Sequence, residues 1–376
     1  MHSPSLSRRR PLSPSLLLHE TPPPKRARQG SIEAAFGGKL VRPKVVALRK
    51  PGPLPALQPG QKYCVDLFCG IGGYSTGAAA AGHVVALAVD CDKELLRCHE
   101  TNHPGAVHLI MDLGPDTEDE LVDQIRKVVP HGAPLHIHGS PPCTKLSTLQ
   151  GSKRYLYGRT QDTDNDAGMA LVVWYFRLIL RLRPASWSFE QVPSLELLGA
   201  LRMMTTLYPS LFAYVRRLNM KHYGVGQARI RCIAGTPSLI AHLRNNEALR
   251  EEAPTIGQLL TPPSGATMFM SSTGRLPDPK RNVLQPDGSF TNDAIYHDCY
   301  RTFDKIGFSC LAGNPMRWSR PDFSRLRGFS PREQAVVQSF PEGYHLPTLI
   351  ATAYVGVGNA IPPRFSKKLM SAPCVQ

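Results

Sequence analysis

The sequence lacks long apolar runs and paired cysteines, and each absence excludes a class of protein. No apolar stretch approaches the length that spans a bilayer, so we expect a soluble chain without a membrane partner. The nine cysteines are odd in number and scattered, and none forms a Cys-x-x-Cys pair. This pattern argues against a disulfide framework and a structural zinc site, and it favours a reducing compartment.

Acidic residues are scarce at the N-terminal end of the chain. The 376 residues carry a formal net charge of +15, and residues 1–60 hold eleven Lys and Arg against Glu20 and Glu33, a net charge of +9. The same segment contains 11 of the 35 prolines. A segment so basic and so rich in proline is typical of disorder and of a polyanionic partner. We therefore expect a disordered basic tail over residues 1–60.

Two basic clusters in this tail, Arg8–Arg10 and Lys25–Arg28, resemble a bipartite nuclear import signal. The acid-poor start of the chain, rich in Ser and Arg, also resembles an organelle transit peptide. A solvated run of charges without any address function fits the same residues. We expect a nuclear protein, with an organelle as the alternative.

Glycines gather after the first strand that we expect in the folded part. The run Tyr63–Phe68 has the pattern of a buried strand, and Ser75–Ala81 has that of a helix ended by Gly82. The turn between them allows close backbone approach through three glycines: Gly70, Gly72 and Gly73. Ser75 stands where the dinucleotide-binding pattern has its third glycine. The segment predicts a nucleotide-binding turn for which a dinucleotide pyrophosphate is a poor fit.

Two further predicted strands end in acidic residues. The strand His83–Val89 leads to Asp90, and the strand Val107–Met111 leads to Asp112. A predicted helix, Glu118–Val129, follows, so strands and helices alternate as in a parallel, doubly wound α/β sheet. An acid at the tip of the second strand suits ribose hydroxyls, whereas a helix cap is the alternative for each acid.

The next predicted strand leads to a cysteine on a loop that begins with two prolines. The alternating run that starts at Leu135 breaks at Gly139, and Pro141 and Pro142 cannot continue a strand ladder. Cys143 is therefore predicted at the carboxyl edge of the sheet, where ligands of open α/β sheets bind. For a lone cysteine, a small buried hydrophobic residue is the competing interpretation.

Charged groups are predicted at the same edge. After a helix, Met169–Leu182, the strand Ala185–Phe189 ends at Glu190. A later strand is predicted to turn three long polar side chains to one face: Gln227, Arg229 and Arg231. Such groups need a base edge, a phosphate or Glu190 as a partner, unless the strand is an exposed edge.

Six motifs, in this order, resemble those of the cytosine C5 DNA methyltransferase family over roughly residues 61–376. They are Asp66–Gly73 (DLFCGIGG), Gly139–Cys143 (GSPPC), Glu190–Val192 (EQV), Gln227–Arg231 (QARIR), Pro331–Tyr344 and Val355–Pro363 (VGVGNAIPP). Two positions depart from the pattern, because Thr144 replaces the usual Gln or Asn and Gln191 replaces Asn. Both departures concern the positioning of the cysteine loop, and every chemical group of the family is present.

The resemblance implies methyl transfer to C5 of a cytosine in double-stranded DNA. Cys143 would add to C6 of the ring, and protonated Glu190 would bond N3. Arg231, with Arg229 close by, would hold O2 of the base. Because both faces of the ring are used, the cytosine must leave the duplex stack.

The resemblance also implies S-adenosylmethionine as the cofactor, and no metal. Phe68 would stack on the adenine, Asp90 would bind the ribose and Asp112 would receive the adenine amino group. The other positions of the implied cofactor site are Asp66, Gly70, Gly72, Gly73, Pro142 and Asn359.

The implied fold is a Rossmann-like, doubly wound, mostly parallel sheet of the class I methyltransferase type. We expect a catalytic domain over residues 61–236, a small irregular target-recognition domain over 237–345 and a return to the catalytic domain over 346–376. Two alternatives share the motifs, namely methylation of tRNA cytosine and a catalytically silent DNA-binding protein. The absence of the Cys-Phe-Thr tripeptide of the tRNA branch favours DNA. The intact set Cys143, Glu190 and Arg231 favours an enzyme.

One segment of the tail, Gln29–Phe36, resembles the peptide that docks on the replication sliding clamp. Gln29, Ile32 and Phe36 match that motif, while Ala35 stands at its first aromatic position. A single helical turn would present Ile32 and Phe36 as apolar anchors. With one aromatic missing we expect weak docking, and a chance match in a biased tail is the competing interpretation.

Overall fold

The structure is a computed structural model that describes residues 45–48, 52–142, 163–271, 300–313, 315–320 and 325–372. The chain divides into two units, Met1–Lys44 and Val45–Gln376, and the described residues all belong to the second. The two basic clusters and the segment Gln29–Phe36 therefore lie outside the described residues. Within the described ranges, no helix is both long and apolar enough to cross a membrane.

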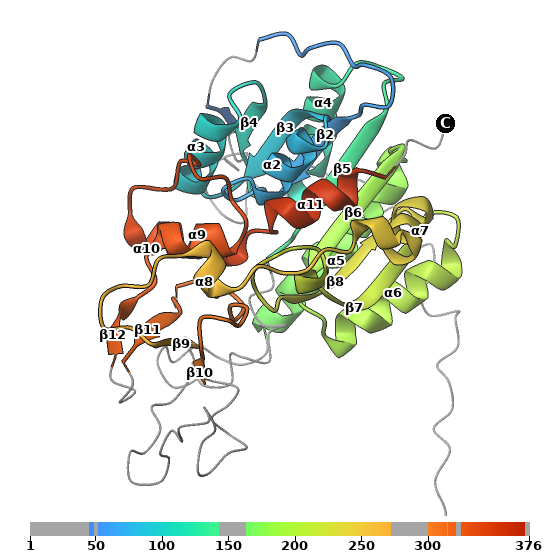
Figure 1. Cartoon of the computed structure of the whole chain (residues 1–376). Coiled ribbons are helices and arrows are strands. Elements are labelled where there is room, and N and C mark those ends of the chain that lie inside the picture. Colours follow the sequence, from blue (N-terminus) through green and yellow to red (C-terminus); the bar gives the residue numbers. More distant parts are fainter. Residues whose placement is uncertain are drawn as a thin grey trace, which may run out of the picture. The chain divides into compact units, whose positions relative to one another are not determined.

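Eight strands form one large sheet in the order β1-β4-β3-β2-β5-β6-β8-β7 (Figure 1). Five neighbouring strands are parallel: β4 (Val107–Ile110), β3 (Val84–Asp90), β2 (Tyr63–Leu67), β5 (Leu135–Gly139) and β6 (Ser186–Gln191). Three strands are antiparallel to their neighbours: β8 (Ile230–Gly235), β7 (Ala213–Asn219) and β1 (Val46–Ala47). The chain passes from β2 outward on both sides, so the topological switch point lies at the carboxyl ends of β2 and β5.

Helices cover both faces of this sheet. One face is packed by α4 (Glu118–Val128), α5 (Thr163–Leu182) and α6 (Leu195–Leu207), and the other by α2 (Gly73–Ala80), α7 (Pro237–Asn245) and α11 (Pro363–Met370). Successive residues of a strand point to opposite faces, so Val65 of β2 packs in the first cluster and Cys64 in the second. The helix α3 (Lys93–Asn102) joins β3 to β4, and the Asp92 carboxylate caps its first turn.

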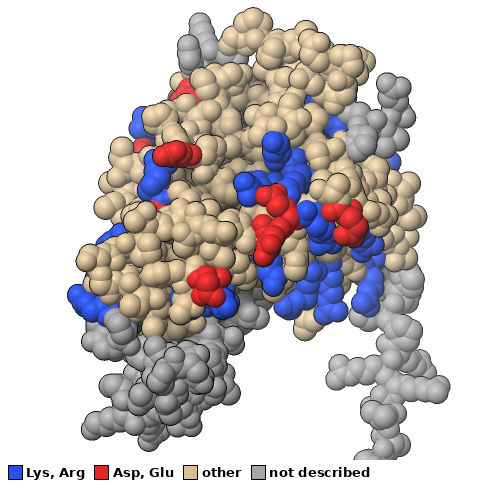
Figure 2. Space-filling view, viewed as in Figure 1, with Lys and Arg blue, Asp and Glu red and all other residues tan. Residues whose placement is uncertain are grey.

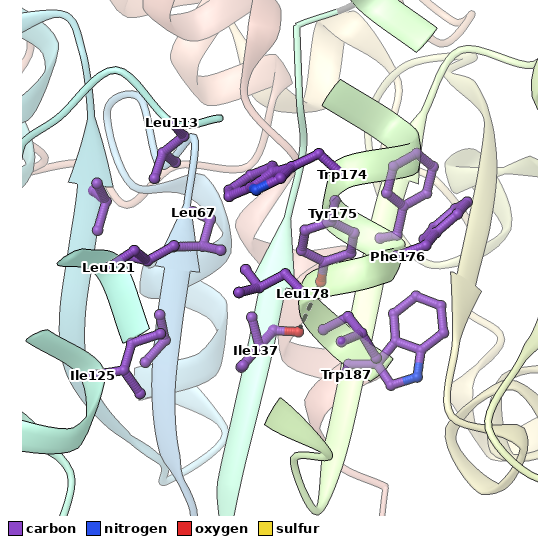
Figure 3. Close-up of a cluster of buried hydrophobic side chains, with 14 of the residues drawn as sticks. Leu67, Leu113, Leu121, Ile125, Ile137, Trp174, Tyr175, Phe176, Leu178 and Trp187 are labelled. Carbon is purple, nitrogen blue, oxygen red and sulfur yellow. Dashed lines mark hydrogen bonds between the residues drawn. The ribbon is translucent and has the colours of Figure 1, made fainter. Parts of the chain in front are cut away.

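The core on the first face holds the end of β5 in place. Aromatic side chains of α5 lie over β5 and β6, with Tyr175 directed at Ile137 (Figure 3). The Tyr175 hydroxyl donates to the carbonyls of Ile137, at 3.2 Å, and Ser188, at 2.8 Å. A Cβ atom on Gly139 would lie 2.3 Å from Cε2 of Tyr175. Glycine is therefore required where the strand passes under this ring.

A second, antiparallel sheet has four strands in the order β10-β9-β11-β12. These are β9 (Met268–Met270), β10 (Tyr300–Arg301), β11 (Arg317–Ser319) and β12 (Arg325–Gly328). The rings of Trp318 and Phe329 stack at 4.2 Å between centroids, and both pack on Phe269. Ile256 and Val337 extend this core from two helices, α8 (Ile256–Leu259) and α9 (Pro331–Val337).

The end of the chain returns to the large sheet. The helix α10 (Ile350–Asn359) packs on α9, and α11 packs on α2. Three short 3₁₀ turns complete the described elements: η2 (Pro115–Thr117), η4 (Met220–His222) and η5 (Glu247–Leu249). Neighbours in space thus come from opposite ends of the sequence.

The predicted fold class is confirmed, because the large sheet is mostly parallel and doubly wound. Two segments differ from the expectation. β1 lies inside the range predicted as disordered, since Val46 pairs with Ile110 at the open edge of β4. Helix α7 lies inside the range predicted for the target-recognition domain, yet Leu239 and Leu243 pack in the core that contains Ile233 of β8.

Candidate active site

The strand register brings the predicted strand tips to one edge of the large sheet. Leu67 lies opposite Val89 in β3 and opposite Gly139 in β5, and Gly139 lies opposite Phe189 in β6. The residue after each of these four therefore lies at the same carboxyl edge: Phe68, Asp90, Ser140 and Glu190. Asp112 follows β4 at this edge, because Asp90 pairs with Ile110.

The glycine turn that follows β2 is shaped by close neighbours. Gly72 has a φ of 92°, in the left-handed region, and a Cβ there would lie 2.8 Å from Cδ2 of His99. A Cβ on Gly73 would lie 2.2 Å from the carbonyl oxygen of Ile361, just before α11. Phe68 also has a positive φ, 59°, which is rare for an aromatic residue and costly unless its surroundings hold it. Its ring meets Trp174 edge-on at 6.2 Å.

Asp90 is tied to that turn by its carboxylate. Oδ2 of Asp90 accepts a hydrogen bond from the Gly70 N–H at 2.8 Å, and Oδ1 accepts one from the Asp92 N–H at 2.9 Å. Among the residues that the structure describes, none places a heavy atom within 4 Å of a Cβ built on Gly70. The turn is therefore anchored on the Asp90 side and open to a ligand on the Gly70 side.

Asp66 is buried and lies beneath the turn. Its carboxylate accepts a hydrogen bond from the Ser75 hydroxyl at 2.7 Å, and Nε2 of His99 lies 3.0 Å from the same Ser75 oxygen. Burial raises the pKa of Asp66 to about 6, against the opposing effects of His138 and the Ser75 hydroxyl. The Asp66 carboxylate thus has its hydrogen-bond partner, Ser75, inside the protein.

The cysteine loop is held at its base. Cys143 and Thr144 lie outside the described residues. Before them, the Ser140 N–H donates to the carbonyl of Leu67 at 3.3 Å. The Gln191 Nε2 donates to the carbonyl of Pro141 at 2.7 Å, so the residue that departs from the family's Asn reaches the loop. Pro142 is exposed.

Glu190 and Arg231 form an ion pair at the sheet edge. Oε1 of Glu190 lies 2.8 Å from Nε of Arg231, and the side chains are 7% and 13% exposed. β8 runs antiparallel to β6, so the first residues of β8 lie beside the last residues of β6. Two motifs that are about forty residues apart are therefore adjacent in space.

The prediction that Gln227, Arg229 and Arg231 share one face of a strand is wrong. β8 begins at Ile230, and Gln227 lies before it in an isolated bridge with Gly307. Arg229 is buried, and its guanidinium donates to the carbonyls of Gly358 at 3.1 Å and Cys310 at 3.3 Å. The chain leaves the strand geometry because its polar groups find partners on neighbouring segments.

Gln227 has the same kind of surroundings as Arg229. Its Oε1 accepts a hydrogen bond from the Cys310 N–H at 2.8 Å, and its amide donates to Gln338. Gln227 and Arg229 therefore link the start of β8 to the segment near Cys310 and to the ends of α9 and α10. Arg231 alone of the three pairs with Glu190.

The remaining predicted residues lie at two places. Asp112 is exposed, and its carbonyl accepts a hydrogen bond from the Thr117 hydroxyl at 2.7 Å. Asn359 is exposed at the last position of α10, and its carbonyl accepts from Arg229 at 3.4 Å. Asn359 is thus adjacent to the start of β8, while Asp112 follows the carboxyl end of β4.

Sequence reasoning missed a set of buried polar residues behind the cysteine loop. His136 and His138 lie on β5, and Ser186 and Ser188 lie on β6. All four are buried, at 5% exposure or less. The signal was present as two polar pairs, each spaced by two residues along a strand with an apolar residue between its members.

A family model of C-5 cytosine-specific DNA methylase matches residues 63–372. The chain belongs to this family. The type II methyltransferase M.HindV of Haemophilus influenzae is 23% identical over 330 residues, which are 82% of this chain and 95% of that enzyme. The type II methyltransferase M.AgeI of Thalassovita gelatinovora is 31% identical over 172 residues, which are 44% of this chain and only 37% of that enzyme.

A solved structure has the same fold. It is a DNA modification methyltransferase encoded within a prophage (E. coli), with a TM-score of 0.55 and 19% identity over 83% of this chain and 98% of that chain. Family membership confirms the resemblance, and the protein is a DNA cytosine-5 methyltransferase with S-adenosylmethionine as methyl donor. The DNA assignment is better supported than the tRNA alternative. The relatives named are bacterial and add no support to a nuclear location.

Proposed function

We propose that Cys143 is the nucleophile of this methyltransferase, with Glu190 and Arg231 as its partners at the target base. The observation that carries this assignment is the 2.8 Å ion pair at the sheet edge, beside the strand that leads into the cysteine loop. A carboxyl and a guanidinium side by side match N3 and O2 of cytosine, which are adjacent on the ring. Arg229 is assigned to holding segments together, because its guanidinium bonds protein carbonyls.

The roles of Cys143, Glu190 and Arg231 follow from the low reactivity of C5 in cytosine. C5 is a weak nucleophile until a group adds at C6 and pushes electron density towards C5. The Cys143 thiolate adds at C6, while Glu190 shares a proton with N3 and Arg231 stabilises negative charge at O2. After C5 is methylated and its proton has left, the bond between Cys143 and C6 breaks. Both faces of the ring are used, so the base is flipped from the duplex.

The residues at the carboxyl edge fit S-adenosylmethionine, which supplies an electrophilic methyl group. The open side of Gly70 admits a ligand against the backbone, next to the anchored carboxylate of Asp90. We assign Asp90 to the ribose, Asp112 to the adenine amino group and Phe68 to the adenine face. The remaining residues of this wall shape the turn or border it: Asp66, Gly72, Gly73, Pro142 and Asn359.

We also propose that the second sheet and its flanking segments form the target-recognition part, over about residues 250–345. The sheet has its own aromatic core, and Gln227 and Arg229 join it to the catalytic part. For the duplex backbone, Figure 2 shows Lys and Arg gathered on the lower right of the face, where Figure 1 places β7 and α7. Exposed arginines of these elements and the nearby turn are Arg216, Arg217, Arg244 and Arg250.

For the tail we propose that the clusters Arg8–Arg10 and Lys25–Arg28 form a nuclear import signal. We also propose that Gln29–Phe36 binds weakly to the sliding clamp. Both proposals rest on the amino-acid pattern. A missing aromatic anchor weakens such docking by roughly 1–3 kcal/mol. A Lys25–Lys39 peptide titrated into purified clamp tests the contact, which Ala35→Phe should tighten and Phe36→Ala should abolish.

The first prediction concerns the nucleophile. Duplex DNA with 5-fluorocytosine at the target should trap the wild-type enzyme covalently when S-adenosylmethionine is present, because fluorine cannot leave C5 as a proton does. Cys143→Ala should form no such complex on a denaturing gel. The structure supplies a matched control in Cys232→Ala, which removes a buried thiol of β8 and should leave trapping intact. Trapping by Cys143→Ala at the wild-type rate would refute the assignment.

A further inference from the structure

A chain of four short contacts runs through the sheet to the cysteine loop. Nδ1 of His136 lies 2.8 Å from Oγ of Ser186, and Nε2 of His136 lies 2.9 Å from Oγ of Ser188. The same Ser188 oxygen lies 2.8 Å from Nδ1 of His138, and Nε2 of His138 lies 2.9 Å from Oγ of Ser140. Ser140 is three residues before Cys143, so the chain ends at the base of that loop.

Burial keeps both imidazoles of this chain neutral. His136 is 0% exposed and His138 is 1% exposed. Burial lowers the pKa of His138 to about 4, although Asp66 acts in the opposite direction. Burial also lowers the pKa of His136 well below its usual value, and Lys62, His138 and His83 act in the same direction. At neutral pH each ring therefore carries one N–H donor and one bare nitrogen acceptor.

Neutral members couple the four contacts to one another. The Ser188 hydroxyl serves both rings and has one proton and two acceptor lone pairs, so it can donate to one ring at most and accepts an N–H from at least one. Each ring has a single N–H, so the role of the nitrogen that faces Ser188 sets the role of the other nitrogen, and a change at any member affects the hydrogen bonds of the rest. The hydroxyl of Ser140 cannot rotate freely while this chain is complete.

An aromatic ring fixes the orientation of the histidines. Tyr74 stacks on His138 with 4.0 Å between ring centroids and an 8° interplanar angle, and it lies 5.9 Å from His136 at 16°. Tyr74 belongs to α2, directly after Gly72 and Gly73 of the glycine turn. The Tyr74 hydroxyl donates to Sδ of Met370 in α11, so the ring is held at both ends.

We propose that His138 is a positioning residue, which sets the Ser140 hydroxyl and so the path of the loop that carries Cys143. The proposal rests on the assignment of Cys143 as the nucleophile. Two further hydrogen bonds anchor the loop besides the contact with His138. The Ser140 N–H donates to the Leu67 carbonyl, and the Gln191 side-chain amide donates to the Pro141 carbonyl. Loss of the His138 link leaves those two in place, so the loop moves within the site and the fold persists.

The test measures the rate at which the full-length enzyme forms the 5-fluorocytosine adduct in a single turnover, with saturating S-adenosylmethionine. His138→Ala and Ser140→Ala should each slow the reaction by roughly tenfold to a hundredfold, the effect of a small misplacement of a reacting group. Binding of DNA and of S-adenosylmethionine should change by less than about threefold, because neither ligand is the partner of His138. The double variant should be no slower than either single variant.

Two further variants separate positioning from general damage. His138→Gln keeps an amide that can bond Ser140, and it should recover most of the rate lost in His138→Ala. His83→Ala is the control, and it should leave the adduct rate unchanged. His83 is a buried histidine just before the first residue of β3, where it accepts a hydrogen bond from the Lys62 N–H and lies near the Met370 carbonyl. If His138→Ala does not fold, Ser140→Ala, at a partly buried loop residue, carries the test.

The outcomes are distinguishable. Failure of wild type to trap, or trapping by Cys143→Ala, would overturn the assignment of the nucleophile itself. If wild type traps through Cys143 while Ser140→Ala matches its rate, the positioning role is wrong and the proposed function stands. Additive losses in the double variant would also contradict the proposal, because they would mean that His138 acts independently of Ser140.

Discussion

Residues that the sequence assigns to one site or to one motif have different surroundings in the structure. Asp66 and Asp90 both belong to the predicted cofactor site, yet Asp66 bonds Ser75 inside the protein while Asp90 lies at the strand tip beside an open glycine. Arg229 and Arg231 differ in the same way, since one bonds carbonyls and the other pairs with Glu190. A residue's role therefore follows from the groups that it meets, and the contrast between Arg229 and Arg231 supplies a matched pair of variants.

Asp90→Ala should weaken the binding of S-adenosylmethionine roughly tenfold to a hundredfold, as loss of a charged hydrogen-bond acceptor does. The change removes the proposed ribose partner and also frees the Gly70 N–H. Isothermal titration calorimetry measures the affinity. Asp92→Ala is the control, because it removes a neighbouring carboxylate whose role is to cap α3. Equal affinity of Asp90→Ala and wild type would exclude the ribose role.

At the scale of elements, the antiparallel placement of β8 assembles the site. A parallel strand would put its first residue at the opposite edge of the sheet from Glu190. Because β8 runs the other way, its first residues lie beside the end of β6, and the segment just before it reaches Cys310 and the end of α10. The segment 227–231 thus serves two purposes, with Arg231 facing the site and Gln227 and Arg229 joining the second sheet to the first.

Arg229→Met should lower the free energy of unfolding by about 2–4 kcal/mol, because the buried carbonyls of Gly358 and Cys310 lose their donor. Arg231→Met should abolish methyl transfer, because the Arg231 side chain lies at the proposed site. Its loss of unfolding free energy should be smaller than that of Arg229→Met. Urea unfolding and a labelled-methyl assay measure the two effects. The same loss of stability in both variants, with activity retained in Arg231→Met, would reverse these roles.

At the scale of the whole molecule, positive charge is divided between the tail and the folded part. Residues 1–60 carry a net charge of +9, and the remaining 33 basic and 27 acidic residues carry +6. A DNA duplex attracts both parts through counterion release, which makes affinity fall with salt. The tail is predicted to add non-specific affinity, while the site selects the base.

Deletion of residues 1–44, which removes the first unit but leaves β1, should flatten the dependence of DNA affinity on salt. The slope should fall by about 0.9 for each phosphate contact that is lost. Fluorescence anisotropy at several salt concentrations gives the slope. A full-length control with the clusters Arg8–Arg10 and Lys25–Arg28 changed to neutral residues should behave like the deletion. An unchanged slope in both would remove the tail from the DNA contact.

The sequence by itself determined the chemistry, the order of the motifs and the doubly wound class of the sheet. These follow from local patterns, because an alternating strand, a glycine turn or a cysteine after two prolines can be recognised within a segment of ten to twenty residues. Tertiary structure alone decided which polar residues face the site. Gln227 and Arg229 left the predicted strand because carbonyls and amides from distant segments surround them, and β1 gained order from the open edge of β4. The chain from His136 to Ser140 exists only because β5 and β6 are neighbours, so their spaced polar residues become hydrogen-bond partners in a dry interior.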